Sequence, residues 1–61
     1  MNGEKLRKLR EERGLTQRAV SIATNLTETT IGIMERGEGN PTLKTVKKLA
    51  DFYGVSVEEL I

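Results

Sequence analysis

The chain has 61 residues, ten basic and nine acidic, and its net charge of +1 neither favours nor excludes a nucleic-acid partner. It contains no cysteine and no histidine, which excludes disulfide bridges and the usual zinc frameworks. A chain this short predicts a single domain, residues 1–61, with a small core that depends on helix packing, caps or a partner subunit. No apolar run approaches the roughly 18 residues of a membrane span and no signal peptide is evident, so we expect a soluble, cytoplasmic protein.

The first predicted helix spans residues 2–13. Leu6 and Leu9 lie three residues apart among charged side chains, which is typical of a helix with a narrow apolar stripe. We expect the lysines and arginines of this helix to form a solvated face. Gly14 ends the helix, because glycine readily adopts the left-handed conformation that follows a last turn.

The second predicted helix covers residues 17–24 and begins after Thr16, whose hydroxyl makes a good N-cap. Val20, Ser21 and Thr24 share its inward face. Asn25 follows at a position that suits a left-handed residue, where asparagine is the best choice after glycine. These features predict a short helix with a defined end.

The third predicted helix covers residues 28–36, after the cap Thr27. Ile31 and Met34 are spaced to point inward from it. Gly37 ends the helix, and the glycine-rich run at residues 37–41, which closes with Pro41, predicts a loop.

The fourth predicted helix follows Thr42 and ends at Gly54. It has the strongest apolar face, formed by Leu43, Val46, Leu49, Ala50 and Tyr53. Ser56 and Glu59 form the capping-box pattern of a fifth, short helix. Leu60 and Ile61 either seal the core or form a dimer seam. The pattern as a whole predicts an all-α fold of five short helices around one core.

Only about three residues, among them Asn25, join the second and third predicted helices. A link this short makes two helices cross at roughly 90–120°, which is the helix-turn-helix arrangement. Ser21 is small, so the third helix can approach the second closely. The second helix of such a pair fits a DNA major groove about 12 Å wide.

Short motifs recur at defined positions along most of the chain, from about Leu6 onward. They are Leu-Thr-Gln at 15–17, Val-Ser at 20–21, Leu-Thr at 26–27, Thr-Ile at 30–31, Met-Glu-Arg-Gly at 34–37, Asn-Pro-Thr-Leu at 40–43, and the stretch 49–60. Together they resemble the phage repressor and Cro family, the Xre-type or lambda repressor-like helix-turn-helix regulators. The resemblance implies a homodimeric transcriptional regulator that binds double-stranded DNA, more often a repressor than an activator, without a cofactor.

The resemblance also implies roles for particular residues. Gln17 is similar to a family glutamine that bonds a backbone phosphate beside the amides of a helix N-terminus, and Arg18 adds a second phosphate contact. Arg10 and Glu35 resemble a family ion pair that bridges the first and third helices. The implied DNA-binding set is Gln17, Arg18, Thr27, Glu28, Thr29, Thr30, Gly32, Ile33 and Arg36.

The third helix departs from the family pattern on its groove-facing side. Glu28, Gly32 and Ile33 stand where the family usually has glutamine, arginine, lysine, serine or asparagine. A glutamate can accept from cytosine N4 and an isoleucine can touch a thymine methyl, while a glycine lets the helix approach DNA closely. Glu38 stands where many relatives have a lysine that faces a phosphate. We therefore expect weaker or unusual direct readout.

Two other classes of function compete with DNA binding. A protein-interaction module would present Gly32 with an apolar patch of Ile22 and Ile33 to a partner. An enzyme is not expected, because no serine, threonine, lysine or carboxylate forms a recognisable pair with a base. The domain is also too small to enclose a typical pocket of about 300–1,000 Å³. We therefore expect no catalytic residue, metal site or small-molecule substrate.

Overall fold

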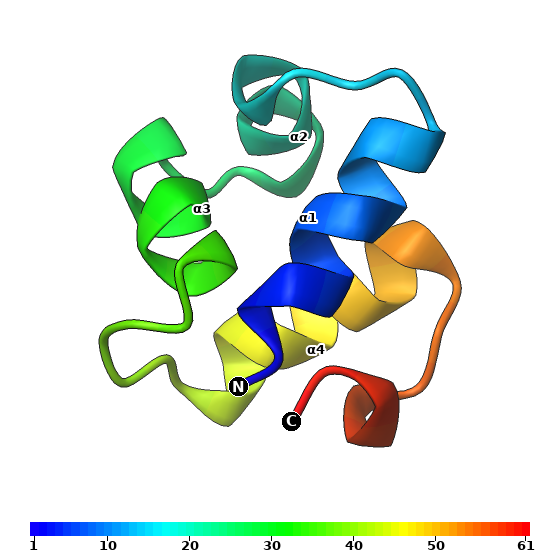
Figure 1. Ribbon diagram of the computed structural model, residues 1–61. Helices are drawn as coiled ribbons and strands as arrows, with labels where there is room; N and C mark the ends of the chain where they lie inside the picture. Colours follow the sequence, from blue (N-terminus) through cyan, green and yellow to red (C-terminus); the bar gives the residue numbers. More distant parts are fainter.

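The computed structural model describes residues 1–61 and is entirely helical, without strands (Figure 1). Its elements are α1 (Gly3–Glu12), α2 (Gln17–Thr24), α3 (Glu28–Glu35), α4 (Leu43–Tyr53) and the 3₁₀ turn η1 (Val57–Glu59). None of the helices is both long and apolar enough to cross a membrane. The all-α prediction is confirmed.

The prediction of a fifth α-helix is wrong. After Ser56 the backbone makes bonds three residues apart, from Glu59 N to Ser56 O and from Leu60 N to Val57 O, at 3.1 and 2.9 Å. The Glu59 carboxylate accepts from the Ser56 amide at 2.9 Å, as the capping pattern predicted. Bonds of this spacing form a 3₁₀ turn, and Leu60, which follows the turn directly, is buried in the core.

Side chains cap the start of all four α-helices. Asn2 Oδ1 accepts from the amide of Lys5 at 3.1 Å. The hydroxyls of Thr16, Thr27 and Thr42 accept from the amide three residues further on, at 3.0, 3.1 and 3.2 Å. Each hydroxyl satisfies a backbone donor that has no partner inside its helix, so the predicted starts are confirmed to within a residue.

The core collects buried side chains from all four helices and from the last turn: Leu6, Leu9, Val20, Ile31, Met34, Val46, Leu49, Ala50, Tyr53 and Leu60. Leu60 is fully buried, whereas the side chain of Ile61 is 70% exposed. The prediction that Leu43 belongs to the apolar face is wrong, because this residue is 71% exposed. Leu43 is the first residue of α4, directly after the cap Thr42, and the buried residues of this helix begin only at Val46.

The beginning of α1 lies directly against the end of α3. A β-carbon at Gly3 would lie 2.5 Å from the carbonyl oxygen of Glu35 and 2.6 Å from the amide nitrogen of Gly37. The amide of Asn2 donates to the carbonyl of Leu60 at 2.6 Å, so the two chain ends lie side by side (Figure 1). Gly3 is therefore required by a close approach of two backbones.

Arg13 is exposed, like most of the predicted solvated face of α1, but it also bonds other parts of the chain. Its guanidinium donates to the carbonyls of Leu9 and Tyr53, at 3.0 and 2.9 Å. The same group lies 5.2 Å from the centroid of the Tyr53 ring, a cation–π distance. Because the Tyr53 carbonyl is at the C-terminal end of α4, Arg13 joins α1 to α4 and satisfies an end-of-helix acceptor.

Candidate nucleic-acid interface

The turn between α2 and α3 consists of Asn25, Leu26 and Thr27. Asn25 is the only residue other than glycine with a positive φ, at 61°, and it ends α2 in the left-handed conformation. The hydroxyl of Ser21 donates to the carbonyl of Leu26, and the Leu26 side chain packs against the core. These contacts turn the chain sharply, so that α3 packs against α2 and α1 (Figure 1).

The outer side of α3 begins with two exposed polar residues, Glu28 and Thr29. The hydroxyl of Thr27 donates to that of Thr30 at 2.9 Å while it caps the helix, so both threonines are bonded within the turn. Ile31 and Met34 are buried on the opposite side. The first turn of α3 therefore offers a carboxylate and a hydroxyl to an approaching molecule.

The loop after α3 partly covers Ile33. A β-carbon at Gly39 would lie only 2.8 Å from Cγ2 of Ile33, and the isoleucine side chain is half-buried. Ile22, on α2, is 74% exposed. The apolar patch of Ile22 and Ile33 stays a prediction. Ile33 exposes less of its surface than it would without the loop, because Gly39 lies against it.

Gly32 is buried. The expectation from the sequence is instead that this glycine leaves the backbone of the helix bare, so that the helix can approach the DNA groove closely. A β-carbon at this position would lie 3.4 Å from Nη1 of Arg36 and 3.7 Å from Oε1 of Gln17. The side chains of Gln17 and Arg36 therefore lie over Gly32. Sequence reasoning missed this cover because it depends on where α2 begins relative to α3.

A largely buried ion pair joins α1 and α3. Arg10 donates from Nε to one carboxylate oxygen of Glu35 at 2.7 Å and from Nη2 to the other at 3.0 Å. Its remaining terminal nitrogen donates to the carbonyl of Leu15 at 2.9 Å. The two side chains are 14% and 5% exposed. The hydrogen bonds that Arg10 donates to Glu35 raise the pKa of Arg10, although burial opposes this rise, so the guanidinium stays charged.

Gln17 joins this network instead of projecting freely. Its Nε2 donates to Oε1 of Glu35 at 3.2 Å, which orients the amide at the first residue of α2. Arg18, the next residue, is exposed and has no ion-pair partner. Arg36 is exposed and donates to Glu38 at 3.3 Å. Polar groups from α1, α2 and the end of α3 thus meet on one side of the molecule.

The helices α2 and α3 are short and are joined by a tight turn, and the first turn of α3 is exposed. This arrangement defines the helix-turn-helix class of protein. A family model described as "Helix-turn-helix" matches residues 6–60. The chain belongs to this family.

Curated relatives cover almost the whole chain. It is 43% identical over 61 residues to the cryptic phage CTXphi transcriptional repressor RstR of Vibrio cholerae, a match over 100% of this chain and 55% of the relative. It is 40% identical over 58 residues to the HTH-type transcriptional regulator DdrOP3 of Deinococcus deserti, over 95% and 45%. The chain therefore spans about half the length of these relatives.

Solved structures show the same fold. The restriction-modification controller protein C.AhdI from Aeromonas hydrophila has a TM-score of 0.86 and 34% identity, over 97% of this chain and 89% of that one. The BldD DNA-binding domain of S. venezulae has a TM-score of 0.80 and 38% identity, over 97% and 88%.

Proposed function

We propose that this chain is a cytoplasmic transcriptional regulator, a repressor, that binds double-stranded DNA as a homodimer with α3 in the major groove. The observation that supports this most directly is the outward first turn of α3, where Glu28 and Thr29 are exposed while the opposite side of the helix is buried. An eight-residue helix presented in this way matches the size of a major groove.

The beginning of α2 would contact the DNA backbone. The amides of its first turn, the Gln17 side chain and the exposed Arg18 lie at a helix N-terminus, where the helix dipole favours a phosphate. Glu28 and Thr29 would contact base edges, the glutamate by accepting from cytosine N4. Thr27, Thr30 and Gly32 would shape the surface, while Ile33 and Arg36 border it.

The relatives support regulation of transcription by DNA binding. RstR is named a transcriptional repressor and the BldD fragment is named a DNA-binding domain. Both resemble this chain over nearly all of its length, which includes the turn between α2 and α3. Repression is the mode that we propose for this chain.

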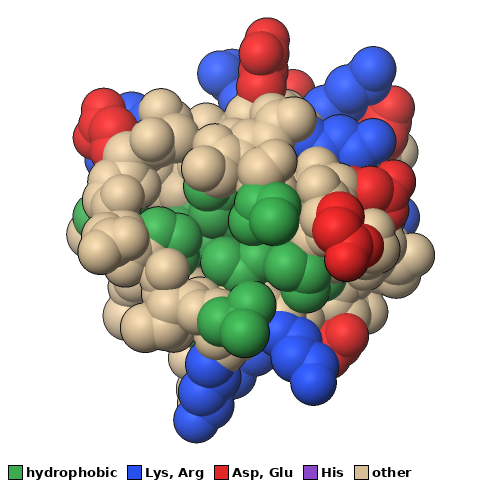
Figure 2. Space-filling model, turned by 90° about the horizontal axis from the view of Figure 1, so that it is seen from below, with side chains coloured by type: hydrophobic (Ala, Val, Ile, Leu, Met, Phe, Trp, Pro, Cys, Tyr) green, Lys and Arg blue, Asp and Glu red, His purple; other side chains and the backbone are tan.

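Exposed apolar side chains support the homodimer. Leu43 and Ile61 are both about 70% exposed, near the start of α4 and the end of the chain. Figure 1 places these segments on the lower side of the molecule, and Figure 2 shows apolar side chains gathered at the centre of that face. Leu60 is buried in the core. Of the last two residues, it is therefore Ile61 that would pack against a second copy of the chain.

Selection from a random duplex library at two salt concentrations tests the proposal. We expect enrichment of a pseudo-palindrome whose half-sites lie about 34–36 Å apart, because two copies of α3 related by a two-fold axis contact successive turns of DNA. We also expect weaker binding at the higher salt concentration, because phosphate contacts release counterions. An absence of any enriched sequence would contradict sequence-specific DNA binding.

A variant with a matched control separates base readout from general charge. Glu28→Gln removes the carboxylate on the first turn of α3 and should change the selected base at one position of each half-site. Glu12→Gln removes a carboxylate that is also exposed, at the end of α1, and should leave the selected sequence unchanged. Identical selected sequences for both variants would remove Glu28 from the interface.

A further inference from the structure

A shallow hollow lies where α1, α2 and α3 meet. It is lined only by polar residues and a glycine: Arg7, Arg10, Gln17, Gly32, Glu35 and Arg36. A neighbouring hollow between α1 and the end of α3 is also bordered by both Arg7 and Arg36. Arg7 of α1 and Arg36, the residue after α3, therefore border the same two hollows.

The three arginines of the hollow differ in how firmly they are held. Arg10 is occupied by both oxygens of Glu35 and by the Leu15 carbonyl. Arg7 is held only by Glu11 at 3.4 Å, and both side chains of this pair are more than half exposed. Arg36 and Glu38 form a similar pair at 3.3 Å. Exposed pairs of this kind contribute little to stability, so their carboxylates are readily exchanged for another anion.

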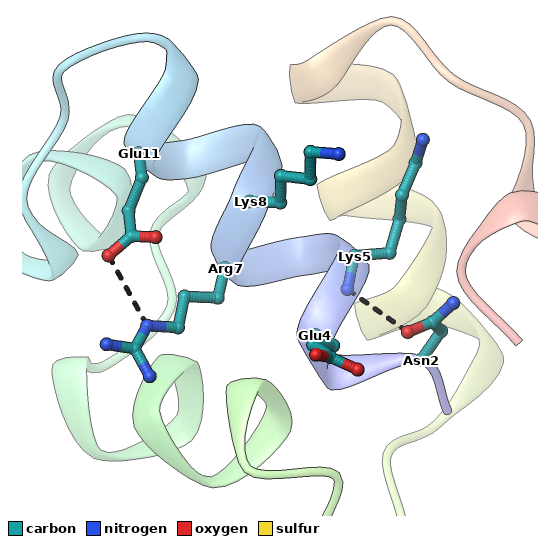
Figure 3. A pocket seen from close by; sticks show the side chains of 6 residues that line it. All are labelled: Asn2, Glu4, Lys5, Arg7, Lys8 and Glu11. Carbon is teal, nitrogen blue, oxygen red and sulfur yellow. Dashed lines mark hydrogen bonds and ion pairs between the residues drawn. The ribbon is translucent and has the colours of Figure 1, made fainter.

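The side chain of Arg7 is directed toward the hollow. In Figure 3 its side chain extends from α1 on the same side as Glu11, across the region where α3 lies, whereas Lys8 points to the other side of the helix. Lys8 lines neither of the two hollows that Arg7 and Arg36 share. Arg7 and Lys8 are adjacent residues of equal charge, but only Arg7 borders the hollow.

Gly32 lines the hollow between the side chains of Gln17 and Arg36. The Arg36 guanidinium lies over this glycine, 3.4 Å from where a β-carbon would be, with the Gln17 amide beside it. The Gln17 amide nitrogen has a second N–H in addition to the one that bonds Glu35. The guanidinium groups of Arg7 and Arg36 and this amide donor thus border one small polar space, whose lining also includes the paired Arg10 and Glu35. Guanidinium groups bind phosphate oxygens through paired hydrogen bonds, which makes a phosphate group the matching ligand.

We infer that Arg7 and Arg36 together bind a single phosphate group in this hollow, and that they release Glu11 and Glu38 when they do so. The inference rests on the proposed function, in which the group is a phosphate of the DNA backbone. Glu11 and Glu38 neutralise the two arginines in the free protein, so they weaken binding to any DNA sequence alike.

The test measures the affinity of the full chain for a random-sequence duplex of about 20 base pairs over a range of salt concentrations. Arg7→Gln and Arg36→Gln should each weaken binding about fivefold to tenfold. The double variant should lose much less than the product of these factors, because both arginines bind the same phosphate. It should also lower the slope of log K against log salt by about one. Lys8→Gln removes the same charge outside the hollow and should change the affinity less than twofold.

The carboxylates provide a test in the opposite direction. Glu38→Gln should strengthen duplex binding about twofold to fivefold, and this gain should vanish when Arg36→Gln is added. All these substituted side chains are exposed, so circular dichroism should show folded proteins throughout. Equal effects of Arg7→Gln and Lys8→Gln would overturn the inference. Effects of the two arginine variants that multiply would overturn it as well, because they would indicate separate phosphates.

Two further outcomes separate the inference from the proposed function. If the unchanged protein binds no duplex at low salt, the proposed function itself is wrong. Inorganic phosphate can be titrated while the arginine side-chain N–H signals are followed by NMR. If it shifts the signals of Arg7 and Arg36 while Arg7→Gln has no effect on duplex affinity, the hollow binds free phosphate and the assignment to DNA is overturned.

Discussion

Among single residues, Arg10 joins three parts of the chain. Its guanidinium binds both oxygens of Glu35 at the end of α3 and the carbonyl of Leu15 just before α2. The Glu35 side chain is 5% exposed, so most of it is shielded from water, although it lines the polar hollow between the helices. Without the guanidinium, only the Gln17 amide would remain to compensate this buried carboxylate.

We expect Arg10→Leu to lower the free energy of unfolding by about 3–5 kcal/mol, because it leaves a buried charge without its partner. Urea denaturation measures this loss. Arg7→Leu is the matched control, since the exposed pair of Arg7 with Glu11 is worth less than about 1 kcal/mol. Equal losses in the two variants would mean that the buried pair has no special role in stability.

At the scale of elements, the geometry of α2 and α3 depends on the turn between them. Asn25 has a φ of 61°. Residues other than glycine adopt this backbone conformation at an energetic cost, which asparagine reduces through local hydrogen bonding. The hydroxyl of Ser21 meets the Leu26 carbonyl, so a polar group of α2 satisfies a backbone acceptor of the turn. The orientation of α3 therefore follows from a few atoms in this connection.

Asn25→Ala should destabilise the protein by about 1–2 kcal/mol, because alanine disfavours the left-handed conformation. Asn25→Gly should stay within about 0.5 kcal/mol of the unchanged protein, since glycine adopts this conformation without steric cost. Thermal unfolding of the two variants side by side gives the comparison. If alanine proves as stable as glycine, the turn has a different backbone conformation from the one described.

At the scale of the whole molecule, α1 packs against both the end of α3 and the end of α4. Gly3 allows the backbone of α1 to approach the backbone of Glu35 and Gly37. Arg13, at the other end of α1, binds the terminal carbonyl of α4. The first helix thus holds in place the segment that ends the proposed DNA-reading helix.

Gly3→Ala should destabilise the fold by about 1–3 kcal/mol, because the added methyl group overlaps backbone atoms that cannot rotate away. Alanine's higher helix propensity acts in the opposite direction and by itself would raise the stability of the fold by up to about 1 kcal/mol. Chemical denaturation with Glu4→Ala as the control checks it, since Glu4 is exposed and should change stability by less than about 0.5 kcal/mol. A more stable Gly3→Ala variant would contradict the close approach of α1 and α3.

The sequence by itself determined where the α-helices begin and end. Thr16, Thr27 and Thr42 cap helices through hydroxyls that bond amides three residues away, and Asn25 ends α2 through its own backbone conformation. The spacing of apolar residues also predicted most of the core. Because these interactions lie within a few residues of one another, the local sequence contains all the atoms that decide them.

Only the tertiary structure decided which positions contact other parts of the chain and which remain in solvent. Gly32 is covered by Gln17 and Arg36, Arg13 bonds Tyr53, and Leu43 remains in solvent despite its helical spacing. These outcomes depend on how helices that are distant along the chain pack together. Periodicity shows which side of a helix is apolar, but the position of a neighbouring helix determines which residues on that side lose contact with water.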